Sequence, residues 1–232
     1  MDILALKKQV YEANMELIER GVVIYTWGNA SGIDRERNLV VIKPSGVDYT
    51  KMTPEDMVEV DLLTGEAKPG QLKPSSDLLT HLELYKGCKD IGGVVHTHSV
   101  NAVAFAQAGK PIPAVGTTHA DYFLYDIPCT RILTEEEVTG SYERNTGKVI
   151  LETIEQHGIG FLEMPAVLVR NHGPFVWGKS PAEAVHHAVV LETVAEMAFK
   201  TLALNTAAGM EDYLREKHFY RKHGKDAYYG QS

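Results

Sequence analysis

Two histidines, His96 and His98, stand one residue apart in the segment GGVVHTHSVNA, residues 92–102, directly behind a β-branched run. In a β-strand, residues i and i+2 point to the same face, roughly 6.5–7 Å apart along the backbone. Two imidazoles so placed can bind one metal ion, because each needs to reach only about 2.0–2.1 Å from zinc. The alternative is a pair of half-exposed histidines at a sheet edge, and the spacing alone does not decide between them.

A third histidine, His172, ends an apolar run in the segment LVRNHGPF and precedes Gly173, which allows a tight turn and close backbone approach. Three histidines from two strand ends form a common arrangement for a catalytic divalent metal that leaves room for substrate. We therefore take His96, His98 and His172 as candidate metal ligands. Of the remaining histidines, we expect His81 to be a partly exposed residue on a helix.

Two Lys-Pro loops, KPSG at 43–46 and KPSSD at 73–77, carry small residues that leave backbone N–H groups open to an anion. The second loop opens a predicted helix, where unpaired N–H groups and the positive end of the helix dipole attract negative charge. The pattern predicts that Ser75 or Ser76 caps this helix, and the alternative to anion binding is that the segment is a plain N-cap. Because both loops occur in one acidic chain, we expect them to form a phosphate cradle from these residues: Asn29, Lys43, Ser45, Gly46, Ser75 and Ser76. Asp77 either favours the helix dipole or reaches the metal as a carboxylate ligand.

The overall charge narrows the classes of partner. The chain has 232 residues, a formal net charge of −8 and a pI near 5.7, which argues against nucleic acid or an anionic membrane as the main partner. Cys88 and Cys129 lie far apart and outside any CxxC pattern, so we expect no disulfide framework and a reducing compartment. With no signal-peptide pattern and no run of about 20 apolar residues, we expect a cytoplasmic protein.

The elements expected to position these residues alternate between helix and strand. Amphipathic or capped patterns predict helices at 2–20, 75–87, 99–109, 134–158, 180–204 and 210–223. Strand or hairpin patterns occur at 22–46, 57–68, 92–98, 127–133 and 165–178. No Gly-x-Gly-x-x-Gly follows a strand, which disfavours a parallel Rossmann sheet. We expect one α/β domain spanning residues 1–232, with a mostly antiparallel or mixed central sheet flanked by helices.

Seven segments in order closely resemble the class II aldolase/epimerase family: TWGNASGIDR, VIKPSG, KPSSD, GGVVHTHS, GTTHADYF, VRNHGPFVWG and KHFYRKHGKDAYYGQ. The resemblance covers essentially the whole chain. It implies that His96, His98 and His172 bind a metal, normally Zn²⁺, and that the nearby Asp77 can also coordinate it. The same donor set accepts Mn²⁺ or Co²⁺ with different affinities. The cradle residues match the family's phosphate and substrate contacts.

The resemblance also implies an acid/base pair, Asp121 and Tyr229, which a neighbouring subunit of a cyclic homotetramer supplies. His218 matches a further residue of that shared site, and Thr117 lies in the same interface motif. The residues alone leave other interpretations open. Asp121 also fits a helix cap or a surface charge, Tyr229 fits simple packing, and His218 fits a solvated basic helix face.

The activity that the resemblance implies is epimerisation of a ketopentose phosphate at C4. The C4 hydrogen is not acidic, so cleavage between C3 and C4 replaces proton abstraction, with the metal stabilising the enediolate as a Lewis acid. Rotation of the aldehyde before the bond re-forms inverts C4, and Asp121 and Tyr229 exchange protons on its two faces. Aldolases of the family usually carry Glu in place of Asp77, and we expect the shorter Asp to leave the enediolate unprotonated. The competing functions are a sugar-phosphate aldolase and a non-catalytic, metal-stabilised binding protein.

Overall fold

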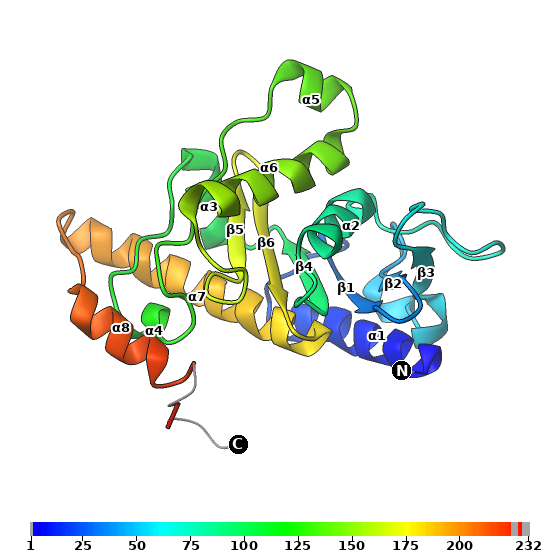
Figure 1. The fold of residues 1–232 in the computed structure, drawn as a ribbon, viewed down its shortest axis with the longest axis horizontal. Helices are drawn as coiled ribbons and strands as arrows, with labels where there is room; N and C mark the ends of the chain where they lie inside the picture. The colour runs from blue at the N-terminus through cyan, green and yellow to red at the C-terminus, as the bar shows by residue number, and fades with distance from the viewer. Residues whose placement is uncertain (1, 224–226, 229–232) are drawn as a thin grey trace.

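Six antiparallel strands form the sheet at the centre of the molecule (Figure 1). The computed structural model describes residues 2–223 and 227–228. The strand order is β3-β2-β1-β4-β6-β5, and each neighbouring pair runs antiparallel. The strands are β1 (Gly28–Asp34), β2 (Leu39–Ile42), β3 (Val58–Asp61), β4 (Gly93–Thr97), β5 (Ala166–Val169) and β6 (Gly173–Gly178). The expected α/β class with a mostly antiparallel sheet is confirmed.

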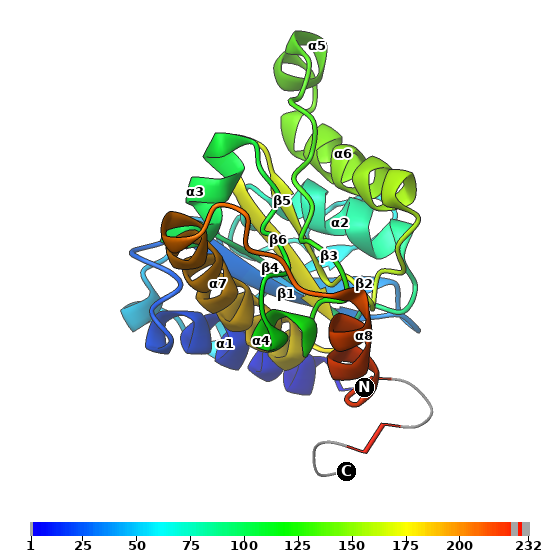
Figure 2. The same ribbon diagram turned by 90° about the vertical axis from the view of Figure 1, so that its left-hand side faces the viewer.

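Helices cover both faces of this sheet (Figures 1 and 2). Helices α1 (Ile3–Glu19) and α7 (Pro181–Leu204) lie along one face, and α2 (Leu78–Gly87) and α6 (Tyr142–His157) lie on the other. The shorter helices are α3 (Val100–Ala108), α4 (Thr117–Ala120), α5 (Glu135–Thr139) and α8 (Asp212–Tyr220). Two 3₁₀ turns, Tyr49–Lys51 and Pro54–Asp56, connect β2 to β3.

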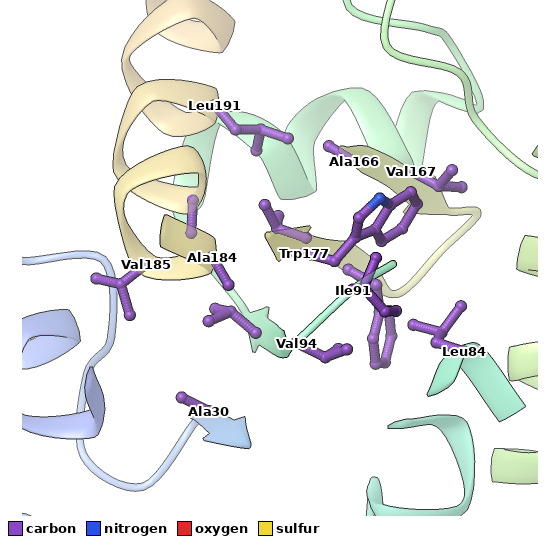
Figure 3. Close-up of a cluster of buried hydrophobic side chains, with 14 of the residues drawn as sticks. Ala30, Leu84, Ile91, Val94, Ala166, Val167, Trp177, Ala184, Val185 and Leu191 are labelled. Carbon is purple, nitrogen blue, oxygen red and sulfur yellow. The ribbon is translucent and has the colours of Figure 1, made fainter. Parts of the chain in front are cut away.

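The core is continuous across the two faces because the strands are covered on both sides. Every residue of β2 and of β5 is buried, which fits their unbroken apolar sequences. Figure 3 shows part of this core, where Ala184 and Leu191 of α7 and Leu84 of α2 flank side chains of β4 and β6. In the described part of the chain, none of the helices has both the length and the apolar character that crossing a membrane requires.

The N-terminus of α2 differs from the prediction. Neither Ser75 nor Ser76 caps this helix, since it begins at Leu78 with Asp77 in the N-cap position and without a side-chain cap. The reason is that the two Lys-Pro loops pair with each other. The Ser45 N–H donates to the Lys73 carbonyl and the Ser75 N–H donates to the Lys43 carbonyl, both at 2.9 Å. This pairing holds the chain extended through Ser75, so the helix starts later.

The segment 127–133 is not the strand that its sequence predicts. It makes isolated bridges at Ile127, with Ile112, and at Cys129, with Leu168 of β5. Pro128 lies between these two positions and has no N–H to donate to a ladder. The segment therefore runs beside β5 without extending the sheet.

Candidate metal and phosphate site

His96 and His98 lie where β4 ends, as the His-x-His spacing predicts. His96 is the fourth residue of the strand, and His98 follows its last residue, Thr97. The two Nε2 atoms are 3.1 Å apart. His96 is buried, whereas His98 is exposed. The pair is therefore anchored on one side and open to a ligand on the other.

His172 joins this pair because β6 lies next to β4. It occupies the turn between β5 and β6, after Asn171 with a φ of 62°. A Cβ at Gly173 would lie 2.8 Å from the Thr97 carbonyl oxygen, so glycine is what lets this turn approach the end of β4. One nitrogen from each of His96, His98 and His172 lies within 4.8 Å of the others. The structure thus brings together all three predicted imidazole ligands.

The surroundings of His96 orient its ring for metal binding. Its Nδ1 lies 2.9 Å from the Pro174 carbonyl oxygen, which can only accept a hydrogen bond. Nδ1 therefore carries the proton, and Nε2 keeps its lone pair toward the other two histidines. Burial lowers the pKa of His172 to about 4 and also lowers the pKa of His98. Neutral imidazoles are the form that binds metal, so the cluster fits a divalent cation.

Tyr142 is a residue of this site that no sequence motif indicated. It opens α6, and its hydroxyl lies 3.2 Å from His172 Nδ1, with the two rings nearly parallel at 28°. An outer contact of this kind fixes the ring of a metal-binding histidine. The sequence around it indicated only a helix, and nothing distinguished Tyr142 or its neighbour Glu143 from other first-turn residues.

Asp77 lies in the same site but outside the group of converging imidazole nitrogens. Its Oδ2 accepts a hydrogen bond from Asn29 Nδ2 at 2.7 Å. Burial would raise the pKa of Asp77, but the neighbouring His96 and His81 rings and the hydrogen bond from Asn29 outweigh it, so the pKa lies below its usual value. Asp77 is therefore an ionised carboxylate beside the histidines, held by an amide on β1.

The predicted cradle residues line one cavity with the histidines. The cavity has a volume of about 600 Å³. Its walls include every predicted cradle and metal residue, together with six residues that were not predicted: Thr26, Trp27, Gly28, Pro44, Tyr142 and Glu143. The first three belong to the segment TWGNAS, so that motif already pointed to this wall. The two Lys-Pro loops and the histidine cluster thus face the same space.

Lys43 contributes to the cavity from a buried position. Its side chain is 2% exposed, and Nζ donates to the carbonyl oxygens of Pro44 and Val47, each at 3.2 Å. The ammonium also lies over the Tyr49 ring at 4.6 Å. Burial lowers the pKa of Lys43, an effect that Asp48 partly offsets. Lys43 therefore holds the 43–47 loop in shape and places positive charge behind it.

Asp121 and His218 form a second cluster, which does not line this cavity. Asp121 follows α4, and its carboxylate lies 3.1 Å from His218 Nδ1, 2.9 Å from Arg221 Nη2 and 3.5 Å from Lys222 Nζ. Burial opposes ionisation, but the bonds from Arg221 and His218 lower the pKa of Asp121. Thr117 begins α4 beside this cluster. Tyr229 lies outside the described residues.

Comparison with known proteins shows which family and which proteins this chain resembles. Residues 8–199 match the family described as Class II Aldolase and Adducin N-terminal domain. The L-ribulose-5-phosphate 4-epimerases UlaF of Salmonella paratyphi B and Salmonella typhi are each 58% identical over 227 residues, covering 97% of this chain and 98% of theirs. A solved L-fuculose 1-phosphate aldolase has a TM-score of 0.78 at 25% identity, covering 94% of this chain and 95% of that one. The L-fuculose-1-phosphate aldolase from Thermus thermophilus shares the fold, with a TM-score of 0.67 at 24% identity over 89% of this chain and 100% of that one.

Proposed function

The chain belongs to the class II aldolase and adducin family, and we propose that it is an L-ribulose-5-phosphate 4-epimerase, an isomerase that interconverts L-ribulose 5-phosphate and D-xylulose 5-phosphate. One observation carries the proposal. Three converging histidines and two paired Lys-Pro loops line a single cavity, in a chain that is 58% identical to enzymes of that name over nearly its whole length.

His96, His98 and His172 would hold the metal, for which we infer Zn²⁺, with Mn²⁺ and Co²⁺ as further ions that this donor set accepts. The fit rests on three convergent imidazole nitrogens and on the Pro174 carbonyl that leaves His96 Nε2 free. A divalent cation supplies Lewis-acid polarisation of the substrate's carbonyl oxygen. Asp77 lies beside this position as a carboxylate, and its bond from Asn29 limits its reach.

The paired loops retain the substrate while its configuration changes. The C4 hydrogen is not acidic, so inversion at C4 proceeds by cleavage and re-formation of the C3–C4 bond. The two-carbon fragment carries the phosphate, and backbone N–H groups of the 43–46 and 73–77 loops bind that phosphate in the way helix starts and turns bind anions. The aldehyde can then rotate without leaving. Lys43, buried behind the loop, adds charge that opposes release.

Asp121 and Tyr229 are the proposed proton donor and acceptor at the rotating aldehyde. Asp121 does not line the cavity of its own chain, so it reaches a substrate only from a second copy. We infer a cyclic homotetramer with active sites between subunits. His218 lies 3.1 Å from Asp121 and orients the carboxylate, and Thr117 lies at the same surface. We also place the enzyme in the cytoplasm, where its free cysteines stay reduced.

The second candidate function is a class II sugar-phosphate aldolase, which the similarity to a solved L-fuculose 1-phosphate aldolase favours. The deciding experiment incubates the Zn²⁺-loaded protein with L-ribulose 5-phosphate and follows D-xylulose 5-phosphate, with a chelator-treated control. Metal-dependent conversion to an equilibrium mixture supports the epimerase. Net accumulation of glycolaldehyde phosphate indicates the aldolase. No turnover after loading with Zn²⁺, Mn²⁺ or Co²⁺ contradicts the epimerase and points to a non-catalytic binding protein or to a different sugar phosphate as substrate.

A further inference from the structure

His81 is wholly buried, which contradicts its expected place as a partly exposed helix residue. Its exposed fraction is 0%, because the face of α2 that carries it packs against β1. Burial lowers the pKa of His81 to about 3, so the imidazole is neutral at ordinary pH. None of the metal or cradle contacts described above requires this side chain, and no sequence motif assigned it a role. A neutral, fully enclosed imidazole next to a proposed active site therefore calls for an explanation.

Two pairs of side chains connect β1 to α2 next to the cavity. Asn29 Nδ2 donates to Asp77 Oδ2 at 2.7 Å, and Ser31 Oγ lies 2.7 Å from His81 Nδ1. Asn29 and Ser31 are two residues apart on a strand and share a face. Asp77 and His81 are four residues apart at the start of α2 and also share a face. The two pairs therefore lie next to each other and join the same two elements, and each is called a rung below.

Hydrogen-bond accounting places the His81 proton on Nε2. Burial raises the pKa of Tyr85, so the phenol keeps its proton. The Val94 backbone lowers that pKa, as an N–H donor does, which leaves Ser31 Oγ, at 2.8 Å, as the acceptor for the Tyr85 proton within the described chain. Tyr85 therefore donates to Ser31, and Ser31 donates its own proton to His81 Nδ1. A neutral imidazole that accepts at Nδ1 carries its hydrogen at Nε2.

Each rung leaves one buried polar atom without a partner among the described residues. These atoms are His81 Nε2, a donor, and Asn29 Oδ1, an acceptor. The Asn29 amide cannot be reversed, because a carboxylate accepts only and the nitrogen must face Asp77. A buried donor and a buried acceptor are each unfavourable when left unpaired, so one partner shared by both atoms would satisfy the two pairs together.

We propose that His81 Nε2–H and Asn29 Oδ1 hold one buried water between the two rungs, and that His81 is thereby a positioning residue for Asp77. The water accepts from His81 and donates to Asn29, which leaves it a second proton for the Asp77 carboxylate. Buried waters in proteins typically make about three such bonds. This network fixes the Asn29 amide. Through that amide it also fixes the direction of the Asp77 carboxylate beside the three histidines.

The His81 ring also contacts His96 indirectly, through Phe175. His81 meets the edge of Phe175 with ring centroids 6.0 Å apart, and Phe175 stacks on His96 at 4.3 Å. A purely packing role for His81 would act along this route. The test must therefore separate the hydrogen-bond route through Asp77 from the packing route through Phe175.

Three variants and one control make that separation. His81→Phe keeps an aromatic ring against Phe175 and removes Nε2–H, and His81→Gln keeps an N–H near the same place. Ser31→Ala removes the partner that sets the imidazole proton on Nε2. Thr153→Val is the control, because Thr153 is also buried and, among the described residues, its hydroxyl donates to the Val149 carbonyl within α6. Circular dichroism and thermal unfolding exclude loss of the fold.

The main readout is Zn²⁺ affinity by competition with a chromophoric chelator, which needs no turnover. We expect His81→Phe and Ser31→Ala to weaken Zn²⁺ binding about tenfold, as loss of outer contacts does at metal sites. His81→Gln recovers most of that loss, and Thr153→Val matches the wild type. In an Asp77→Ala background, His81→Phe has no further effect, since its route is already cut. A tenfold loss that persists there, or wild-type affinity in His81→Phe, overturns the proposal.

The inference rests on the proposed function only for its kinetic measurement, the kcat/KM for L-ribulose 5-phosphate. We expect kcat/KM for L-ribulose 5-phosphate to fall about tenfold in His81→Phe, in parallel with metal affinity. If the wild type shows no epimerisation, the proposed function fails, while the Zn²⁺ affinities still decide the role of His81. A crystal structure of the wild type adds a direct check, because density for a water within hydrogen-bond distance of both orphan atoms is required.

Discussion

The ring of His96 lies flat on the ring of Phe175, with centroids 4.3 Å apart and an angle of 14° between their planes. The two residues are direct partners in the register of β4 and β6. This stack holds one imidazole of the proposed metal site against the sheet, so the position of that ring depends on the packing of β4 and β6.

Replacing Phe175 by Leu should therefore weaken metal binding more than it destabilises the fold. A volume-similar apolar exchange costs about 1 kcal/mol in the free energy of unfolding, whereas the freed His96 ring should lower Zn²⁺ affinity about tenfold. Chelator competition and urea unfolding measure the two effects. Phe105→Leu, in α3, is the matched control. Equal Zn²⁺ affinities in the two variants would contradict this prediction.

The proposed phosphate cradle predicts a change in KM that depends on the substrate's phosphate. Lys43→Met keeps most of the buried stem but removes the charge and the bonds to Pro44 and Val47. Because hydrogen bonds to charged groups contribute about 1.5–3 kcal/mol, KM for L-ribulose 5-phosphate should rise at least tenfold. Turnover of unphosphorylated L-ribulose, measured at high concentration, is the control and should change much less. A similar loss for both sugars would mean that Lys43 serves the fold rather than the phosphate.

Much of the site follows from local sequence patterns, because its residues lie in short segments with distinctive spacing. His96 and His98 are two apart at a strand end, and His172 lies in a Gly-containing turn, so each position was predictable from its neighbours. The three side chains converge because β4 and β6 are neighbours in the sheet. That strand order depends on contacts between segments far apart in the sequence. The positions of the three histidines at two strand ends suggested that convergence, and the family resemblance supported it, but neither established the strand order.

Residues that act through tertiary contacts carried no such signal. Tyr142 reaches His172 only because α6 packs against α2 and β5. His81 has the sequence context of an ordinary amphipathic helix, and its burial depends on Ser31 and Tyr85 lying opposite it. The predicted N-cap of α2 was wrong for the same reason, since the distant 43–46 loop pairs with the residues that precede the helix.

Acid should weaken the contact between α4 and α8 through Asp121. The folded-state pKa of this carboxyl lies below its unfolded value, so the unfolded chain binds more protons and stability falls as pH decreases. The contribution is complete above the unfolded pKa of about 4 and is lost as pH falls through the lower folded-state value. Thermal unfolding of the wild type and Asp121→Asn between pH 7 and pH 3 measures it. The difference between the two midpoints should shrink below about pH 4, and a constant difference would contradict the assignment.

We expect Asp77 to influence whether the two cleaved fragments recombine or are released. Its carboxylate is held by Asn29 at 2.7 Å and is short, so it should not protonate the three-carbon fragment. Asp77→Glu extends the carboxylate by one methylene and should increase release of free dihydroxyacetone and glycolaldehyde phosphate relative to D-xylulose 5-phosphate. Product analysis at early times measures the ratio, and Asp77→Asn controls for loss of charge. An unchanged ratio in Asp77→Glu would reject this explanation of the epimerase outcome.

The separation of Asp121 from the cavity of its own chain leads to a test by subunit mixing. His98→Asn should be inactive for want of a metal ligand, and Asp121→Asn for want of a proton-transfer group. In a cyclic oligomer each site takes its histidines from one subunit and Asp121 from the next. Random 1:1 exchange therefore pairs two intact contributions at about a quarter of the sites. Mixed oligomers, verified by mass spectrometry, should regain that fraction of wild-type activity. The separately exchanged single variants are the controls, and no recovery after verified exchange would place the whole site within one chain.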